Sequence, residues 1–274
     1  MLQFSIVEQI ALAIFLLSGI SFFLYHLLLR LKIILKGKSN FTVDELPKRI
    51  VRVVDEVILH KKVASGQRKS AGILHALVMY GFIFFGLITI NHFGMAFGFP
   101  IFSDSLRHTY FLIFGAPWAI LCTIGILGLA YRRFVIKPEA LGKFSSTSAL
   151  VSVFIVTLMT TYLIDELHIL SGSAEKINWW LHSGVIGGFL FLIPQSKHMH
   201  LVLSPFNIFL RPFEVPSHGA IPIDMEASEE ELDNLLLDLS RLSKDQALDI
   251  FTCVECGRCT DVCPANRGGG ILDP

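Results

Sequence analysis

Residues 180–200 read WLHSGVIGGFLFLIPQSKHMH, a mostly apolar stretch with His182 near its start and His200 at its end. If the stretch is one helix rising about 1.5 Å per residue, the two histidines lie roughly 27 Å apart along it. This distance is close to the thickness of a bilayer's hydrocarbon core, about 30 Å. The separation of 18 residues is also near five whole turns, so both imidazoles are expected on one face of the helix. The spacing therefore suits ligands for two haems at opposite membrane depths.

The composition is that of a membrane protein. The chain has 274 residues, of which 53% are hydrophobic and 17% are charged, and its mean hydropathy is +0.60. Soluble domains carry about 25% charged residues. The formal net charge is +0, which gives no reason to expect a nucleic-acid partner. Four of the five cysteines cluster near the end, which is unlike the disulfide framework of a secreted protein and favours a metal site in a reducing compartment.

Five apolar stretches predict five membrane-spanning helices and hence an all-α membrane protein. They cover residues 6–29, 71–92, 110–130, 149–164 and 179–203. Basic residues follow the first and third stretches, whereas the loops after the second and fourth are poor in Lys and Arg. The positive-inside rule then places the N-terminus outside the inner (cytoplasmic) membrane and the tail from Ser204 onward in the cytoplasm.

The predicted domains follow from this order of segments. Residues 1–210 form the five-helix membrane domain, and residues 211–250 form an acidic linker with a helix that is either solvated or used for docking. Residues 251–274 begin a cytoplasmic, α-helical, ferredoxin-like domain.

Four histidines form two depth-matched pairs. His75 and His92 lie at opposite ends of the second span, so antiparallel packing against the fifth span pairs His75 with His200 and His92 with His182. Each pair is a candidate set of axial ligands for one b-type haem. His75 and His92 differ by about 100° in helical phase, so the second span must rotate or distort to serve both haems. His198 competes with His200, and helix-end histidines can also act as polar caps at headgroup level.

Glycines near these histidines allow two interpretations. They could leave room for a flat macrocycle, or they could let neighbouring helices pack closely. The glycines concerned are Gly81, Gly86, Gly184, Gly187 and Gly188.

The cysteine motif is the most specific feature of the chain. Cys253, Cys256, Cys259 and Cys263 have the spacing C-x2-C-x2-C-x3-C-P of bacterial [4Fe–4S] ferredoxins, and Gly257 permits the tight turn between them. Zinc sites more often separate two C-x2-C pairs by a dozen residues or more. In two-cluster ferredoxins the fourth cysteine ligates the other cluster, and no second run follows here. One local cluster, ligands from a partner, or a truncated chain would each account for this, and the glycine run before the end favours truncation.

Two families share these features. The five-span region resembles the cytochrome b (gamma) subunit of respiratory nitrate reductase, with His182, His200 and the stretch Pro194–Lys197 (PQSK) carrying the resemblance. The tail FTCVECGRC, residues 251–259, resembles the iron–sulfur domain of heterodisulfide-reductase-like proteins. The fusion is similar to membrane iron–sulfur oxidoreductases associated with electron-transfer flavoproteins. The resemblance implies electron transfer between a cytoplasmic flavoprotein and menaquinone.

The resulting hypothesis is a quinone-linked oxidoreductase. Electrons would move between a cytoplasmic Fe–S or flavoprotein donor and the quinone pool through one or two b-type haems. One rival is a non-haem membrane anchor that recruits a soluble oxidoreductase, and another is a metal transporter with intramembrane histidines. Asp165, Glu166 and His168 are weak candidates for a quinone site, with interfacial solvation as their alternative role.

Overall fold

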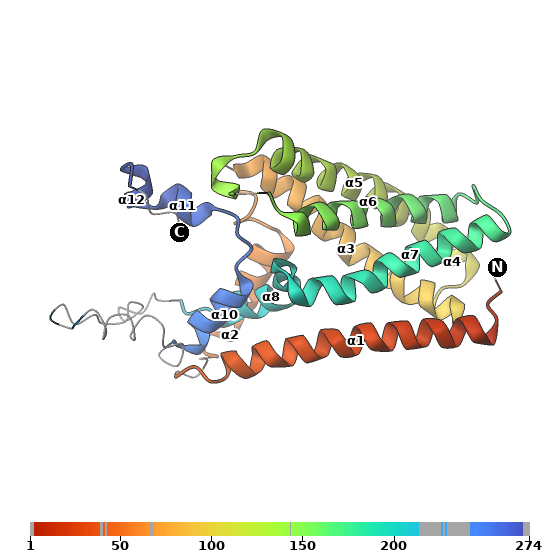
Figure 1. The fold of residues 1–274 in the computed structure, drawn as a ribbon, viewed down its shortest axis with the longest axis horizontal. Helices are drawn as coiled ribbons and strands as arrows, with labels where there is room; N and C mark the ends of the chain where they lie inside the picture. The colour runs from red at the N-terminus through yellow and green to blue at the C-terminus, as the bar shows by residue number, and fades with distance from the viewer. Residues whose placement is uncertain are drawn as a thin grey trace. The chain divides into compact units, whose positions relative to one another are not determined.

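The computed structural model describes residues 3–38, 41, 43–65, 68–142, 144–213, 226, 228 and 242–270. Over these ranges all regular structure is helical, and they contain no strand (Figure 1). Five helical stretches are long and apolar enough to cross a membrane. They are Ile6–Ile34, Lys69–Ala96, Asp104–Ile136, Ser146–Glu166 and Ser173–Gln195. The helical class and the five candidate spans are thus confirmed.

The chain divides into two compact units that alternate along the sequence. The first unit comprises residues 1–21, 63–191 and 256–274, and the second comprises residues 22–62 and 192–255. The predicted domain limits at residues 210 and 250 stay a prediction. Most of the acidic linker lies outside the described residues.

Large apolar side chains on the outside of the first unit are consistent with a lipid environment. On α1 (Ile6–Ile34), Ile14 is 64% exposed and Leu17 is 62% exposed. An aqueous surface would not keep so continuous an apolar face uncovered. On the other side of this helix, Leu12 is buried against Trp179 and Ala96.

Close helix packing in the first unit depends on glycine. A Cβ atom at Gly81 of α3 (Lys69–Ala96) would lie 2.8 Å from the Cys122 sulfur of α5 (Ala116–Tyr131). A Cβ atom at Gly187 of α7 (Ser173–Leu192) would lie 2.1 Å from the Phe15 ring.

A third close contact of this kind involves Gly188. A Cβ atom there would lie 2.9 Å from the Phe154 ring of α6 (Ser146–Glu166). Gly81, Gly187 and Gly188 therefore serve helix packing, whereas Gly86 and Gly184 face open space.

The third span, Asp104–Ile136, is longer than predicted, and it is assembled from α-helical and π-helical segments. It begins with α4 (Asp104–Tyr110), for which the Ser103 side chain accepts a hydrogen bond from the Leu106 amide. One π-helical turn (Phe111–Gly115) joins it to α5, close to Pro117, and a second (Arg132–Ile136) ends the span. A proline donates no backbone hydrogen bond, which is a common cause of such local rearrangement.

The prediction that residues 179–203 form one continuous helix is wrong. The helix α7 ends at Leu192, and two 3-10 turns, Ile193–Gln195 and Lys197–Met199, precede α8 (His200–Leu210). Between these turns Ser196 is extended, with φ −133° and ψ 171°. Pro194 cannot donate the next helical hydrogen bond. His182 and His200 therefore lie on different helices, and the argument that they share one face does not hold.

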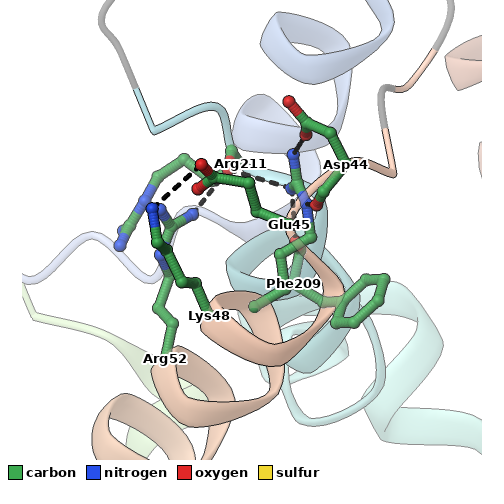
Figure 2. Close-up of polar contacts among 7 residues, drawn as sticks. Asp44, Glu45, Lys48, Arg52, Phe209 and Arg211 are labelled. Atoms are coloured by element: carbon green, nitrogen blue, oxygen red, sulfur yellow. Dashed lines mark hydrogen bonds and ion pairs between the residues drawn. The ribbon is translucent and has the colours of Figure 1, made fainter.

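A buried arginine, Arg49, joins segments of the second unit; Figure 2 labels Asp44, Phe209 and Arg211, whose backbone oxygens accept its hydrogen bonds. Arg49 of α2 (Leu46–Val53) is 1% exposed and donates to the backbone oxygens of Asp44, Phe209 and Arg211 at 2.7, 2.7 and 3.2 Å. Its guanidinium also pairs with the Asp44 carboxylate. The last carbonyls of α8 lack helical partners, so Arg49 supplies a C-terminal cap from another helix.

Candidate functional site

The structure brings together one of the two predicted histidine pairs. His92 of α3 and His182 of α7 have ring centroids 4.9 Å apart, with an interplanar angle of 57°. His182 is buried, and the ring of Trp179 stacks on His92 at 4.6 Å and 14°. Both histidines belong to the first unit, so their meeting is a feature of one compact body.

Hydrogen bonds set the orientation of both rings. The Thr161 hydroxyl of α6 donates to the Thr157 carbonyl at 2.7 Å, so its oxygen accepts the Nδ1–H of His182 at 2.7 Å. This fixes the tautomer and leaves the lone pair of His182 on Nε2. His92 Nε2 bonds to the Ser183 hydroxyl at 2.9 Å. A neutral imidazole with a fixed tautomer is the form that ligates a metal ion.

The pair has the chemistry of haem ligands, but its rings lie closer together than two ligands of one iron would. Two axial imidazole nitrogens at about 2.0 Å from a metal lie about 4 Å apart, with ring centroids roughly 6 Å apart. The observed centroid distance of 4.9 Å is shorter than this. Haem binding therefore requires His92 to leave Ser183 and the rings to separate by about 1 Å.

A cavity of about 290 Å³ lies against His92 in the first unit. Helices α3, α4, α6 and α7 and the loop after α3 provide its walls. It is lined by Phe4, Ile88, Asn91, His92, Met95, Phe102, Asp104, Arg107, Tyr110, Tyr162, Asp165, Glu166, His168, Glu175 and Trp179.

Polar contacts hold the wall of this cavity in place. The buried Asn91 side-chain oxygen accepts the backbone amides of Ile101 and Phe102, each at 2.9 Å. Tyr110 donates its hydroxyl to the Phe84 carbonyl at 2.9 Å. The loop that carries Phe102 is thus fastened to α3, and the aromatic wall is preformed.

The charged groups around the cavity are not paired with one another. Among the described residues, neither Asp165 nor Glu166 lies within ion-pair distance of Arg107. The only polar contact of the Arg107 side chain across the described ranges is with the Met95 sulfur, at 3.8 Å. Tyr162 is 5% exposed, and within the described part of the chain its hydroxyl has no hydrogen-bond partner. Ionisable groups at membrane depth are costly and usually have a function.

His198 and His200 belong to the second unit. His200 Nδ1 donates to the Lys197 carbonyl at 2.9 Å, which places the lone pair on Nε2. Burial lowers the pKa of His200, and it lowers the pKa of His198 to about 4, so both imidazoles are neutral near pH 7. Their rings lie 6.2 Å apart, and either is chemically suited to bind a metal. His75 lies on α3 in the first unit, so the pairing of His75 with His200 stays a prediction.

The thiols of the cysteine segment are not gathered around one point, and the predicted [4Fe–4S] cluster stays a prediction. All four cysteines are outside disulfides, and Gly257 has φ +72° at the start of α11 (Arg258–Val262). In the described ranges no three His, Cys, Asp or Glu side chains lie together as a metal site. The boundary between the two units falls after Glu255, between Cys253 and Cys256. The assignment of a cluster therefore rests on the motif.

An arginine that the sequence did not single out as functional contacts this segment. Arg68 bonds to the backbone oxygens of Cys256 and Gly257 and pairs with Asp261 of α11. In addition, Arg258 donates to the Val63 carbonyl at 2.9 Å. Val63, Arg68 and the contacted part of the cysteine segment, residues 256–261, all lie in the first unit.

The other residues missed from the sequence are Arg107, Tyr162, Thr161 and Ser183. Each is a polar side chain within or beside a predicted span, and that position was the only available indication of a role.

Comparison with known proteins gives two relatives. A probable iron–sulfur-binding oxidoreductase FadF of Bacillus subtilis (strain 168) is 30% identical over 92% of this chain and 39% of its own length. The second relative, an EtfAB:quinone oxidoreductase of Syntrophomonas wolfei, is 25% identical over 74% of this chain and 33% of its own length. Together the two relatives support an iron–sulfur oxidoreductase family. The chain thus spans about two fifths or less of each relative. No family model and no solved structure matches it.

Proposed function

We propose that this chain carries electrons between a cytoplasmic Fe–S centre or flavoprotein and membrane quinone through b-type haems. The observation that supports this most directly is the meeting of His92 and His182 from two apolar helices, with the His182 tautomer fixed by Thr161. The oxidoreductase names of both relatives agree with such a role, and one of those names includes EtfAB and quinone.

In this proposal the histidines hold haem in two places. His92 and His182 would ligate the outer haem, and His75 with His200 or His198 would ligate the inner one. A b-type haem accepts and releases one electron at a time. Thr161 and Ser183 orient the outer ligands, and the carbonyl of Lys197 orients His200.

The cysteines would supply the cytoplasmic end of the path. Cys253, Cys256, Cys259 and Cys263 would hold a [4Fe–4S] cluster that receives electrons from an electron-transfer flavoprotein. In this proposal the segment lies in the cytoplasm and the N-terminus outside the inner membrane, which the basic loops support through the positive-inside rule. Menaquinone or another quinone would be the partner in the lipid bilayer.

The alternative is a membrane anchor without haem. The rings of His92 and His182 contact each other at 4.9 Å, and His92 also bonds to Ser183 and stacks on Trp179. These contacts need no metal ion. This observation favours two histidines that pack α3 against α7 for structural reasons.

A difference spectrum separates the two functions. Membranes containing the full chain are measured as dithionite-reduced minus air-oxidised, with haem and iron counted per chain. We expect b-type bands that lose one haem equivalent in His182→Ala and none in His108→Ala, an exposed histidine of α4. Absence of porphyrin, with iron bound only through the cysteines, would establish the anchor.

A further inference from the structure

The cavity beside His92 combines a flat aromatic wall with unpaired charges. Phe102 and the buried ring of Trp179 line it, and Trp179 in turn stacks on His92. Arg107 and the carboxylates of Asp165 and Glu166 face the same space without forming ion pairs among the described residues. A simple packing defect would be apolar and would need none of these groups.

The size and charge of the cavity restrict its ligand. A volume of about 290 Å³ is at the lower limit for small-molecule pockets and suits one or two fused rings. Glu175 adds a third carboxylate to the lining beside Asp165 and Glu166. This acidic set disfavours a lipid phosphate. A neutral planar molecule with carbonyl oxygens can pack against the aromatic lining and accept hydrogen bonds from Arg107 and the Tyr162 hydroxyl.

We propose that this cavity binds the ring of a quinone, with Arg107 and Tyr162 as donors to its carbonyl oxygens and Asp165 and Glu166 as its proton exchangers. The assignment of the ligand class rests on the proposed function, whereas the site itself rests on the cavity and its contacts. Tyr162 is a candidate donor because its side chain lines the cavity and its hydroxyl has no hydrogen-bond partner among the described residues.

The reaction at this site balances with two electrons and two protons. On reduction, both quinone C=O groups become C–OH groups, with one new O–H bond on each oxygen. The carboxyl groups of Asp165 and Glu166 donate these protons and take them back from the outer solution. The electrons come one at a time from the b-haem class of carrier that the proposed function assigns to His92 and His182. Quinol oxidation is the reverse.

The location accounts for the presence of acids near an electron carrier. His92 lines the cavity and lies 4.9 Å from His182 by ring centroid, so a ring bound there is next to the histidine pair. Asp165 and Glu166 are the last residues of a span at its loop end, where protons can reach them from water. Protons and electrons would thus reach the quinone from different sides.

Equilibrium binding of menadione, a tail-free naphthoquinone, tests the site. The full chain in detergent micelles is titrated with radiolabelled menadione, and micelles without protein supply the background. We expect one saturable site per chain. Arg107→Gln should weaken binding at least tenfold, and Arg107→Lys should recover part of the loss. Saturable binding that is equal in wild type, Arg107→Gln and Tyr162→Phe would overturn the proposal, as would no saturable binding.

A second measurement tests the proton exchangers. We expect the double variant Asp165→Asn, Glu166→Gln to keep menadione affinity within about threefold. It should reduce menadione at least tenfold more slowly, because the carboxamides carry no exchangeable acid proton. Glu139→Gln, at an exposed carboxylate that does not line the cavity, is the matched control and should match wild type in both measurements. An unchanged reduction rate in the double variant would refute the role of these acids.

The two experiments separate failure of the site from failure of the proposed function. Menadione binding needs no electron transfer, so it can be measured even if no porphyrin is found. If porphyrin-free protein binds menadione in a way that depends on Arg107, the quinone site is supported and the haem path is refuted. If haem-containing protein shows no saturable menadione binding, the haem path is supported and this quinone site is refuted.

Discussion

Replacing Arg49 by Met should destabilise the second unit by about 2–4 kcal/mol. Methionine keeps an unbranched apolar stem of similar length and removes every donor of the guanidinium. The backbone oxygens of Asp44 and Phe209 then lose their partner, whereas that of Arg211 keeps a hydrogen bond from Arg52. Each buried acceptor left unsatisfied costs about 1–3 kcal/mol. Part of this cost is offset because the variant no longer buries a charge, whose desolvation costs several kcal/mol.

The Asp44 carboxylate adds little to this sum and gives a pH signature. Its side chain is 67% exposed, so it is rehydrated when Arg49 is removed. Hydrogen bonding from Arg49 holds the pKa of Asp44 below its usual range. A lowered folded-state pKa contributes stability above the unfolded pKa of about 3.9, and the contribution is lost as pH falls below it. The variant should therefore lose less stability than wild type on acidification from pH 5 to pH 3.

The assay is unfolding in mixed micelles, followed by helical circular dichroism as the mole fraction of SDS rises. The matched control is Lys48→Met, one residue earlier in α2. Lys48 is 67% exposed and pairs with Glu45 at 2.9 Å, so the control should lie within about 1 kcal/mol of wild type. Equal unfolding midpoints for the Arg49 and Lys48 variants would refute the reasoning that Arg49 caps α8.

Three further predictions concern the first unit. If His182 ligates haem as proposed, Thr161→Val should lower haem retention by about 10–100-fold in a haem-to-protein titration, because His182 loses the partner that fixes its tautomer. Thr161→Ser should keep it. Gly187→Ala should lower the free energy of unfolding by about 1–3 kcal/mol, since its Cβ would lie 2.1 Å from a phenylalanine ring of α1. Gly184→Ala, in open space, should leave it unchanged, and equal stabilities of the two variants would contradict this prediction. Arg68→Gln should reduce the iron bound per chain and broaden the electron paramagnetic resonance signal of the reduced protein. The control Arg267→Gln, at an exposed arginine, should change neither.

Local composition and spacing were enough to predict the membrane class and the five spans. Apolar runs of this length can bury their backbone hydrogen bonds only as helices in lipid, so length and hydropathy predict each span without knowledge of its neighbours. The pairing of His92 with His182 was also predicted, because two antiparallel helices bring equal depths together.

The continuity of the fifth span was not predicted correctly. Pro194 was visible in the sequence, but helices of membrane proteins often tolerate proline, and only the structure shows that α7 stops and that Ser196 is extended. The glycines likewise had two interpretations. Only the neighbouring side chains show that Gly81 and Gly187 serve helix packing.

The sequence by itself determined the long apolar helices and the cysteine motif, because these depend on residue type and on distance along the chain. Only the tertiary structure placed Arg107, Tyr162 and the acids at the end of α6 around one cavity, and only it joined Arg49 to the end of α8. Such contacts join segments that are far apart in sequence, and they depend on helix rotation and side-chain direction. No local pattern in the chain encodes either of these.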